Sequence, residues 1–233
     1  MPENFSKNVG SKNKLKRFQD NEVFDNVIQP LRSEIVDEEF QFKGKWKRDF
    51  FKNDKPLILE LGCGKGEYTL GLAKRNKDCN YLGIDIKGAR FWKGAKTALE
   101  GDLSNVGFLR TQIELVDQVF AKGEVDGIWI TFPDPQIKWK RTKHRMTNPE
   151  FLKKYKHILT KEGIMHLKTD SEFMHGYTLG ILEGLGHEII YAHHNIYVNH
   201  EAPEEVVGIK TFYEQQYLDK NKLITYLKFR LKP

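Results

Sequence analysis

The chain has little cysteine, no long apolar run and no internal repeat. Its 233 residues contain two cysteines, Cys63 and Cys79, which are too few for a disulfide framework and fit a reducing compartment. No apolar stretch approaches the roughly 18–20 residues that a membrane-spanning helix needs. The first residues are polar and lack the apolar core of a secretory signal. We therefore expect a cytoplasmic protein with no membrane segment.

The excess of positive charge is modest. Lysine and arginine total 38 against 32 acidic residues, so the net charge is +6 and the isoelectric point is about 9.1. This balance is compatible with an anionic partner but does not establish one. We expect a basic, partly mobile N-terminal arm over residues 1–40 and one domain over residues 41–233. The lysines of the first 20 residues fit either an ordinary disordered terminus or an arm that contacts nucleic acid.

Three glycines spaced two apart follow a short apolar run and are preceded by an acid. The segment reads Glu60, Gly62, Gly64 and Gly66. A dinucleotide-binding fingerprint would need its third glycine at the position of Glu67, and a pyrophosphate would meet two carboxylates there. S-adenosylmethionine carries a sulfonium and no phosphate. The loop therefore favours this cofactor over NAD.

Strand-like and helical segments alternate along most of the chain. Strands are expected at 57–62, 80–86, 106–112, 125–132, 163–169, 187–197 and 222–231. Helices are expected at 65–76, 88–100, 114–122, 149–160 and 171–185. This alternation predicts an α/β fold with a doubly wound, mostly parallel, seven-stranded sheet. The last two runs lack a helical crossover and predict a C-terminal antiparallel hairpin, as in the Rossmann-like class I methyltransferases.

Two acids follow strands of this predicted sheet. Asp85 ends the run at 80–86, about where the hydroxyl pair of a ribose would lie. Asp134 lies between two prolines after the run at 125–132, which restricts its backbone. An Asp before Pro is also common in Asx turns and helix caps. Because the first and fourth strands should be neighbours, we favour a site role for Asp134 beside the glycine loop.

A basic segment follows directly. Five of the eight residues from Lys138 to Arg145 are cationic, and Trp139 and His144 lie among them. A solvated face is the ordinary explanation of such a run. No acid compensates these charges, however, and phosphate contact together with base stacking requires this mixture of residues. The segment therefore predicts contact with RNA.

Three further polar residues are candidates for the same site. Asp170 ends the fifth predicted strand, and Thr211 and Glu214 open a short segment after an acidic loop. The histidines at 193, 194 and 200 lack the paired spacing of metal ligands on one element, so we expect no metal site.

In combination these motifs resemble the bacterial tRNA (guanine-N7-)-methyltransferase family. The similarity covers roughly residues 50–230 and rests on the glycine loop, Gly83-Ile-Asp85, Pro133-Asp134-Pro135 with its basic run, Thr169-Asp170 and Thr211-x-x-Glu214. It departs from the family at Gln112, where an acid usually accepts from the adenine amino group. A glutamine carbonyl can still accept one such bond. It departs again at Gln136, where the family commonly has an aromatic residue.

The resemblance implies a role for each matching position. Cofactor binding would involve Glu60, Gly62, Gly64, Gly66, Asp85, Gln112 and Asp134, and Asp134 would also be catalytic. Substrate binding would involve Lys138, Asp170, Thr211, Phe212, Tyr213 and Glu214. Contact with RNA would involve Lys140, Arg141, Thr142, Lys143, His144 and Arg145.

The implied reaction is methyl transfer from S-adenosylmethionine to N7 of guanine 46 in the variable loop of tRNA. Asp170 and Glu214 are the two acids left to read the guanine edge, and the sequence does not choose between them. Two alternatives remain open. One is a class I methyltransferase with another RNA position or a protein as its target, and the other is a non-catalytic RNA-binding protein with this fold.

Overall fold

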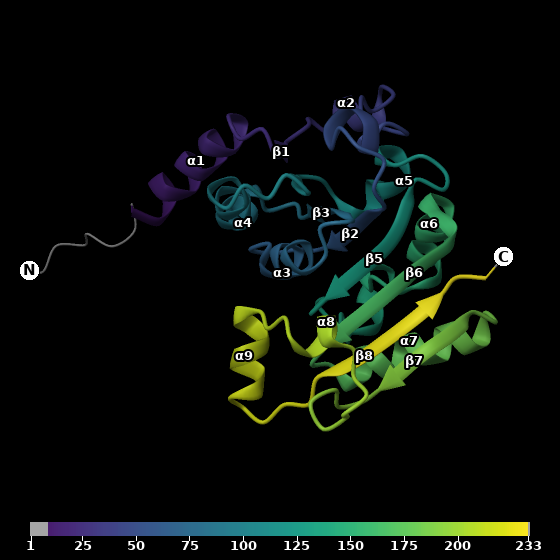
Figure 1. Ribbon diagram of the computed structural model, residues 1–233. Helices are drawn as coiled ribbons and strands as arrows, with labels where there is room; N and C mark the ends of the chain where they lie inside the picture. Colours follow the sequence, from purple (N-terminus) through teal and green to yellow (C-terminus); the bar gives the residue numbers. More distant parts are fainter. Residues whose placement is uncertain (1–8, 233) are drawn as a thin grey trace, which may run out of the picture.

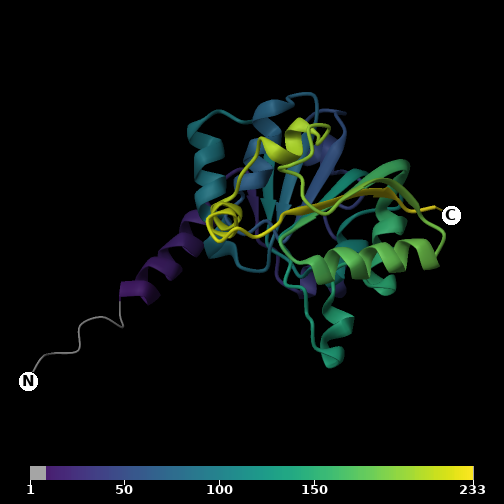
Figure 2. The same cartoon turned by 90° about the horizontal axis from the view of Figure 1, so that it is seen from below.

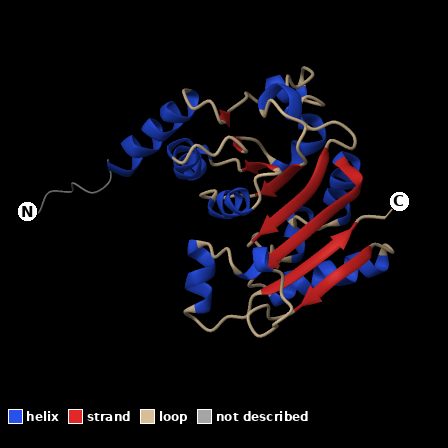
Figure 3. Cartoon of the chain, viewed as in Figure 1, coloured by secondary structure: helices blue, strands red, loops and turns tan. Residues whose placement is uncertain are grey.

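The computed structural model describes residues 9–232, in which one twisted sheet is covered by helices on both faces (Figures 1 and 3). The strands are β1 (Val27–Ile28), β2 (Leu57–Leu61), β3 (Asn80–Ile84), β4 (Val106–Leu109), β5 (Val125–Thr131), β6 (Leu159–Thr169), β7 (Glu188–His193) and β8 (Thr225–Arg230). The α-helices are α1 (Val9–Glu22), α2 (Ser33–Val36), α3 (Glu67–Arg75), α4 (Gly88–Glu100), α5 (Val116–Val119), α6 (Pro149–Ile158), α7 (Glu172–Gly184), α8 (Glu204–Val207) and α9 (Phe212–Leu218). Three short helical turns are η1 (Trp46–Phe50), η2 (Ile113–Leu115) and η3 (Trp139–His144).

The strand order is β1-β4-β3-β2-β5-β6-β8-β7. All neighbouring strands are parallel except at β8, which lies between β6 and β7 and is antiparallel to both. The predicted fold class is thereby confirmed, with one addition. The sheet has eight strands because the two-residue β1 pairs with β4, and two residues are too short to produce a periodic pattern in a sequence.

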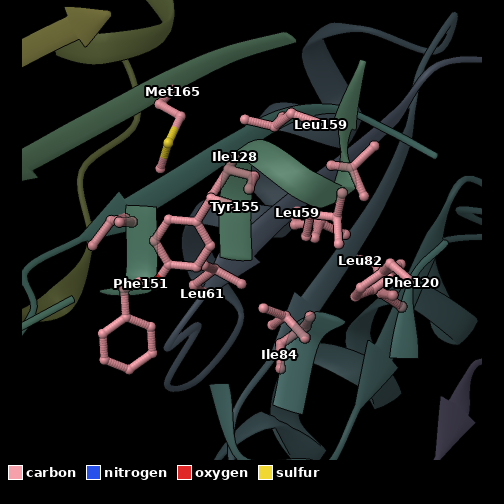
Figure 4. Close-up of a cluster of buried hydrophobic side chains, with 14 of the residues drawn as sticks. Leu59, Leu61, Leu82, Ile84, Phe120, Ile128, Phe151, Tyr155, Leu159 and Met165 are labelled. Atoms are coloured by element: carbon pink, nitrogen blue, oxygen red, sulfur yellow. The ribbon is translucent and has the colours of Figure 1, made fainter. Parts of the chain in front are cut away.

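Alternate residues of the central strands point to opposite faces of the sheet. Leu59 and Leu61 of β2 lie with Leu82 and Ile84 of β3 in one cluster, which α5, α6 and α7 cover (Figure 4). The opposite face, under α3 and α4, is less uniform. It carries buried Trp129 and Tyr226 together with polar side chains that belong to the candidate site. One face therefore serves as core, and the other combines packing with function.

The N-terminal segment is attached to the edge of the sheet. Helix α1 lies against α4 and extends from the body of the domain (Figure 2). Its end is held by Asn21, whose side-chain amide donates to the carbonyl of Gly88 at 3.0 Å. Phe108 and Arg110 of the β4 region donate to the carbonyls of Asn26 and Ile28. The division into an arm of residues 1–40 and a domain of residues 41–233 stays a prediction, and residues 1–8 of the arm lie outside the described part.

Residues 9–232 meet neither the requirements of a membrane-spanning helix nor those of a metal site. No helix there is both long enough and apolar enough to cross a membrane. The same residues contain no group of three or more His, Cys, Asp or Glu side chains placed to hold a metal ion.

Candidate active site

The glycine loop joins β2 to α3 in a conformation that side chains rarely adopt. Gly62, Gly64 and Gly66 all have positive φ angles, between 56° and 78°. A Cβ atom on Gly66 would also lie 2.6 Å from the ring of Phe108. The loop is held against the end of β3, because the backbone amides of Gly62 and Cys63 donate to the carbonyl of Ile84. A larger residue at Gly66 would displace the loop.

Two carboxylates flank this loop. Asp85 accepts from the amide of Gly64 at 3.0 Å and from that of Lys87 at 2.8 Å. Glu60 is buried beneath the loop, where it accepts from the amide and hydroxyl of Thr69 and from the hydroxyl of Thr131. Burial raises the pKa of Glu60 to about 7. Asp85 keeps lone pairs for a ligand, whereas Glu60 joins β2 to α3 and β5 and, when ionised, contributes negative charge next to the loop.

A cavity of about 280 Å³ lies beside Asp85, at the ends of β3 and β4. Its wall includes Ile86 and Gln112, and the N-terminal segment contributes Pro30 and Arg32. The Arg32 guanidinium donates to the side-chain oxygen of Gln112. The oxygen expected to accept from an adenine amino group is therefore shared with Arg32, and its second lone pair remains for a ligand.

The charges at the loop fit a cationic ligand better than a phosphate. Lys65 is the one cation between Glu60 and Glu67. Its ammonium lies 4.1 Å from the ring centre of Phe212 in α9, and Glu67 accepts from the amide of Phe212 at 2.8 Å. Glu60, Glu67 and Asp85 outnumber Lys65, so acids dominate the charge at the loop. This arrangement, beside the cavity of about 280 Å³, fits S-adenosylmethionine.

Asp134 lies on a restrained turn after β5. The residues on either side of the Pro-Asp-Pro segment, Phe132 and Gln136, both have φ near 48°, which is costly for residues other than glycine. One oxygen of Asp134 accepts from the amide of Gln136 at 3.0 Å. The carboxylate is exposed. Asp134 thus combines the Asx-type turn expected of such a sequence with an acid available to a ligand.

Asp134 and Asp170 line one hollow of about 660 Å³. Arg90 of α4 and the rings of Tyr213 and Tyr217 in α9 form other parts of its wall. Asp170 follows β6 and receives a 2.6 Å hydrogen bond from Lys222. The carboxyl ends of β5 and β6 therefore bring two predicted site acids together, as the topology of an open α/β sheet requires.

The basic segment divides into an exposed turn and a buried anchor. Lys138 and the cations of η3 are exposed, and Trp139 is 85% exposed. The turn projects on one side of the domain (green-teal, bottom of Figure 2). Arg145, which was expected to contact RNA, is only 5% exposed and donates to the carbonyls of Gln136 and Ile137. Its guanidinium also stacks on Tyr177, so Arg145 holds the Asp134 turn in place.

Glu214 lies in the protein interior and is saturated with hydrogen bonds. Its carboxylate pairs with Lys168 of β6 at 2.7 Å and accepts from the hydroxyl of Tyr197 at 2.6 Å. With Thr211 it forms the capping box that begins α9. Burial lowers the pKa of Lys168 to about 8, while Glu214 acts in the opposite direction. Phe212 and Tyr213, by contrast, are about half exposed. The Thr211–Glu214 stretch thus has buried ends and an exposed aromatic middle.

Sequence reasoning missed two residues that build the site. Lys168 also donates to the carbonyls of Val206 and Ile209, so it fastens the α8–α9 segment to the sheet. Its place near the carboxyl end of β6, two residues before Asp170, was the signal that could have revealed it. Arg32 offered no comparable signal, because its partner Gln112 is 80 positions away.

With this geometry in view, comparison with known proteins settles the family. Residues 54–227 match a family described as "Putative methyltransferase". A protein of Christiangramia forsetii named tRNA (guanine-N(7)-)-methyltransferase is 67% identical over 96% of this chain and 100% of its own length. One of the same name from Bacteroides fragilis is 47% identical over 94% of this chain and 86% of its own. The chain belongs to the tRNA (guanine-N7-)-methyltransferase family. The resemblance noted in the sequence is confirmed, and with it the predicted dependence on S-adenosylmethionine.

Solved structures support the fold alone. The 16S rRNA methyltransferase KamB superposes with a TM-score of 0.59 at 15% identity, over 77% of this chain and 89% of its own. The 16S rRNA (adenine(1408)-N(1))-methyltransferase from Catenulisporales acidiphilia gives 0.55 at 11% identity, over 78% and 91%. The class I methyltransferase fold is therefore confirmed.

Proposed function

We propose that this protein methylates N7 of a variable-loop guanine in tRNA, with S-adenosylmethionine as methyl donor. The observation that carries the proposal is the hollow shared by Asp134 and Asp170. Its wall includes Tyr213, whose ring centre lies 6.0 Å from the ammonium of Lys65 in the glycine loop, and Ile137, which directly precedes the basic segment with the exposed cations of η3. Family membership supports the same substrate. A tRNA substrate further supports the predicted cytoplasmic location.

On the donor side, Asp85 would accept from the two ribose hydroxyls through charge-assisted hydrogen bonds. The glycines allow the backbone to approach the ligand closely, and Glu60 supplies negative potential from beneath the loop. Gln112 would accept from the adenine amino group. When bound, S-adenosylmethionine supplies an electrophilic methyl group.

On the acceptor side, no residue has to remove a proton, because guanine N7 carries a free lone pair. The purine gains positive charge as N7 is methylated, and the restrained Asp134 carboxylate would stabilise that charge. Arg145 holds the Asp134 turn in one conformation by donating to the carbonyls of Gln136 and Ile137, which offsets the cost of the positive φ angles at Phe132 and Gln136. The remaining contribution of the protein is alignment of the two reactants.

We propose that Asp170, rather than Glu214, reads the guanine edge. Guanine presents N1–H and its 2-amino group as adjacent donors, which one ionised carboxylate can accept. Asp170 lines the hollow, whereas the acceptors of Glu214 are taken by Lys168, Tyr197 and its own helix cap. Lys138, the η3 side chains at 140–144, Phe212 and Tyr213 remain candidates for contact with the surrounding RNA.

The decisive experiment is mass spectrometry of nucleosides from unmodified tRNA incubated with the enzyme and labelled donor. We expect 7-methylguanosine as the labelled product. A label at another nucleoside, or in protein, would identify a different target, and failure to bind the donor in calorimetry would indicate a non-catalytic RNA-binding protein. Inosine at the target position, which lacks the 2-amino group, should react more slowly. Asp170→Ala should reduce this preference for guanosine over inosine, whereas an unchanged preference would exclude Asp170 as the reader.

A further inference from the structure

Helices α1 and α4 together carry an excess of positive charge outside the site described above. We call their exposed cations the α1–α4 surface. They are Lys14, Lys16, Arg17, Lys87, Arg90, Lys93 and Lys96. Residues 13–22 and 87–100 contain these seven cations and three acids, so their net charge is 7 − 3 = +4. Two of the acids are engaged, because Asp20 accepts from the indole of Trp92 and Glu100 lies 3.6 Å from Lys96.

The cations of α4 form a line that begins at the active site. Arg90, Lys93 and Lys96 are three residues apart, which places them along one side of the helix over about 9 Å. Arg90 lines the same hollow as Asp134. If a polyanion such as RNA places one nucleotide in this hollow, the part of its chain that continues outside the hollow therefore meets this row of positive charges.

The neighbouring helix extends this row sideways. Between α1 and α4 lies a hollow of about 560 Å³, whose wall includes Lys16, Arg17, Trp92 and Lys96. The Arg17 guanidinium lies 5.1 Å from the ring centre of Trp92, and the Lys96 ammonium lies 5.5 Å from it. The Trp92 ring orients Arg17 without neutralising its charge, whereas Lys96 also lies 3.6 Å from the carboxylate of Glu100.

The surface is preformed because polar contacts fix α1 and the chain that follows it on α4. Asn21 donates to the carbonyl of Gly88 at 3.0 Å, and Asn26 donates to the carbonyl of Ala95 at 3.0 Å. The side-chain amides of both residues are thus directed at backbone groups of α4. Little ordering of the helices is required before an anion binds.

We infer that the α1–α4 surface binds the sugar–phosphate backbone of tRNA beyond the target nucleotide. This inference rests on the proposed function. Charge complementarity carries it, since the row starts at the pocket where the guanine would lie and contains no acid until Glu100. The cations of η3 follow β5 and those of α4 follow β3, on opposite sides of β2 in the sheet. The tRNA would therefore be held on two sides of the reacting base.

The test compares two triple variants with the same change in charge. Arg17→Ala/Lys93→Ala/Lys96→Ala removes three cations of the surface. Lys122→Ala/Lys156→Ala/Lys161→Ala removes three exposed lysines at the opposite, amino-terminal edge of the strands. Binding of full-length unmodified tRNA is measured between 50 and 200 mM salt (typical working range). The surface variant should bind at least about tenfold more weakly at low salt, with the salt slope reduced by about 2–3, whereas the control should change less than about twofold.

A second substrate separates this surface from the pocket. Guanosine 5′-monophosphate fills only the hollow and does not extend along α4 or to α1, so its binding should be the same in the wild type and the surface variant. Equal losses in both triple variants, an unchanged salt slope, or an equal loss with the mononucleotide would each overturn the inference. Circular dichroism checks that α1 and α4 remain folded. Because binding is measured without methyl transfer, the outcome does not depend on whether the wild type forms 7-methylguanosine.

Discussion

The donor side and the acceptor side of the site are built in different ways. On the donor side, Gly62–Gly66 and Asp85 lie at the ends of adjacent strands and are held largely by backbone hydrogen bonds between them. On the acceptor side, Arg145 holds the Asp134 turn, Lys222 donates to Asp170 from 52 positions away, and Tyr213 and Tyr217 of α9 complete the hollow. The glycine loop and Asp85 follow from the geometry of adjacent strands, whereas the acceptor side and the Arg32 wall of the donor side require contacts across the chain.

The largest expected effect is the loss of stability when the buried Lys168–Glu214 ion pair is broken. Lys168→Met would leave the Glu214 carboxylate buried without its partner and should lower the free energy of unfolding by about 3–5 kcal/mol. Urea denaturation measures this change. Lys168→Met/Glu214→Gln removes both charges and should recover most of the loss. A double variant as unstable as the single one would show that the charge is not the cause.

If α8–α9 serves mainly the acceptor side, the Lys168→Met/Glu214→Gln variant should bind tRNA more weakly or methylate it more slowly. Its affinity for the donor should be retained. Calorimetry with the donor and filter binding with tRNA give the two values. An equal loss of both affinities would contradict the division into two sides.

Asp134→Asn keeps the shape of the side chain and removes its charge. We expect the rate of methyl transfer to fall by about a hundredfold, which is typical of the loss of one electrostatic stabiliser of a transition state. Single-turnover kinetics at saturating tRNA and donor measures this rate. The affinity for tRNA should change little, and a fall confined to affinity would make Asp134 a binding residue only.

The raised pKa of Glu60 predicts a pH dependence on the donor side. A cationic ligand favours the carboxylate, so donor affinity should increase as pH rises to about 7 and then level off, with at most a tenfold change per pH unit below 7. Calorimetry in buffers of different ionisation enthalpy should detect proton release on binding near pH 7. In Glu60→Gln both effects should disappear.

The same pKa has a consequence for stability. The pKa of Glu60 lies above its ordinary value of 4.5, so the folded state holds the proton more strongly than the unfolded state. The contribution of this group to the free energy of unfolding is full below about pH 4.5 and is lost as pH rises through about 7. Denaturation of Glu60→Gln should lack this component, and a wild-type-like profile would exclude Glu60 as its source.

The smallest expected effect concerns the hydrogen bond between Arg32 of the N-terminal segment and Gln112 on the donor side. Arg32→Ala removes an exposed hydrogen bond to Gln112 and should weaken donor binding by about 0.5–1 kcal/mol, or up to about fivefold. Binding of tRNA measured without donor is the control. In a Gln112→Ala background the Arg32 substitution should have no further effect, and full additivity would show that the two residues act separately.

The parts of the site that were predictable lie where a strand ends. Glycines after an apolar run, and acids at Asp85, Asp134 and Asp170, could be placed because parallel strands end at one edge of a sheet. The interior position of Glu214 and the anchoring role of Arg145 could not be predicted. A short motif does not reveal whether its acid or its cation faces solvent or a buried partner from elsewhere in the chain.

By itself, the sequence determined the alternation of strands and helices, the glycine loop with its acids and the family to which the chain belongs. These follow from period, turn chemistry and motifs that act over a few residues. Only the tertiary structure decided that β1 joins the sheet, that Lys168 fastens α8–α9 through Glu214, and that Arg32 donates to Gln112 in the proposed donor pocket. The physical reason is that each of these depends on burial and pairing between residues about 50 to 80 positions apart, which no local pattern in a chain encodes.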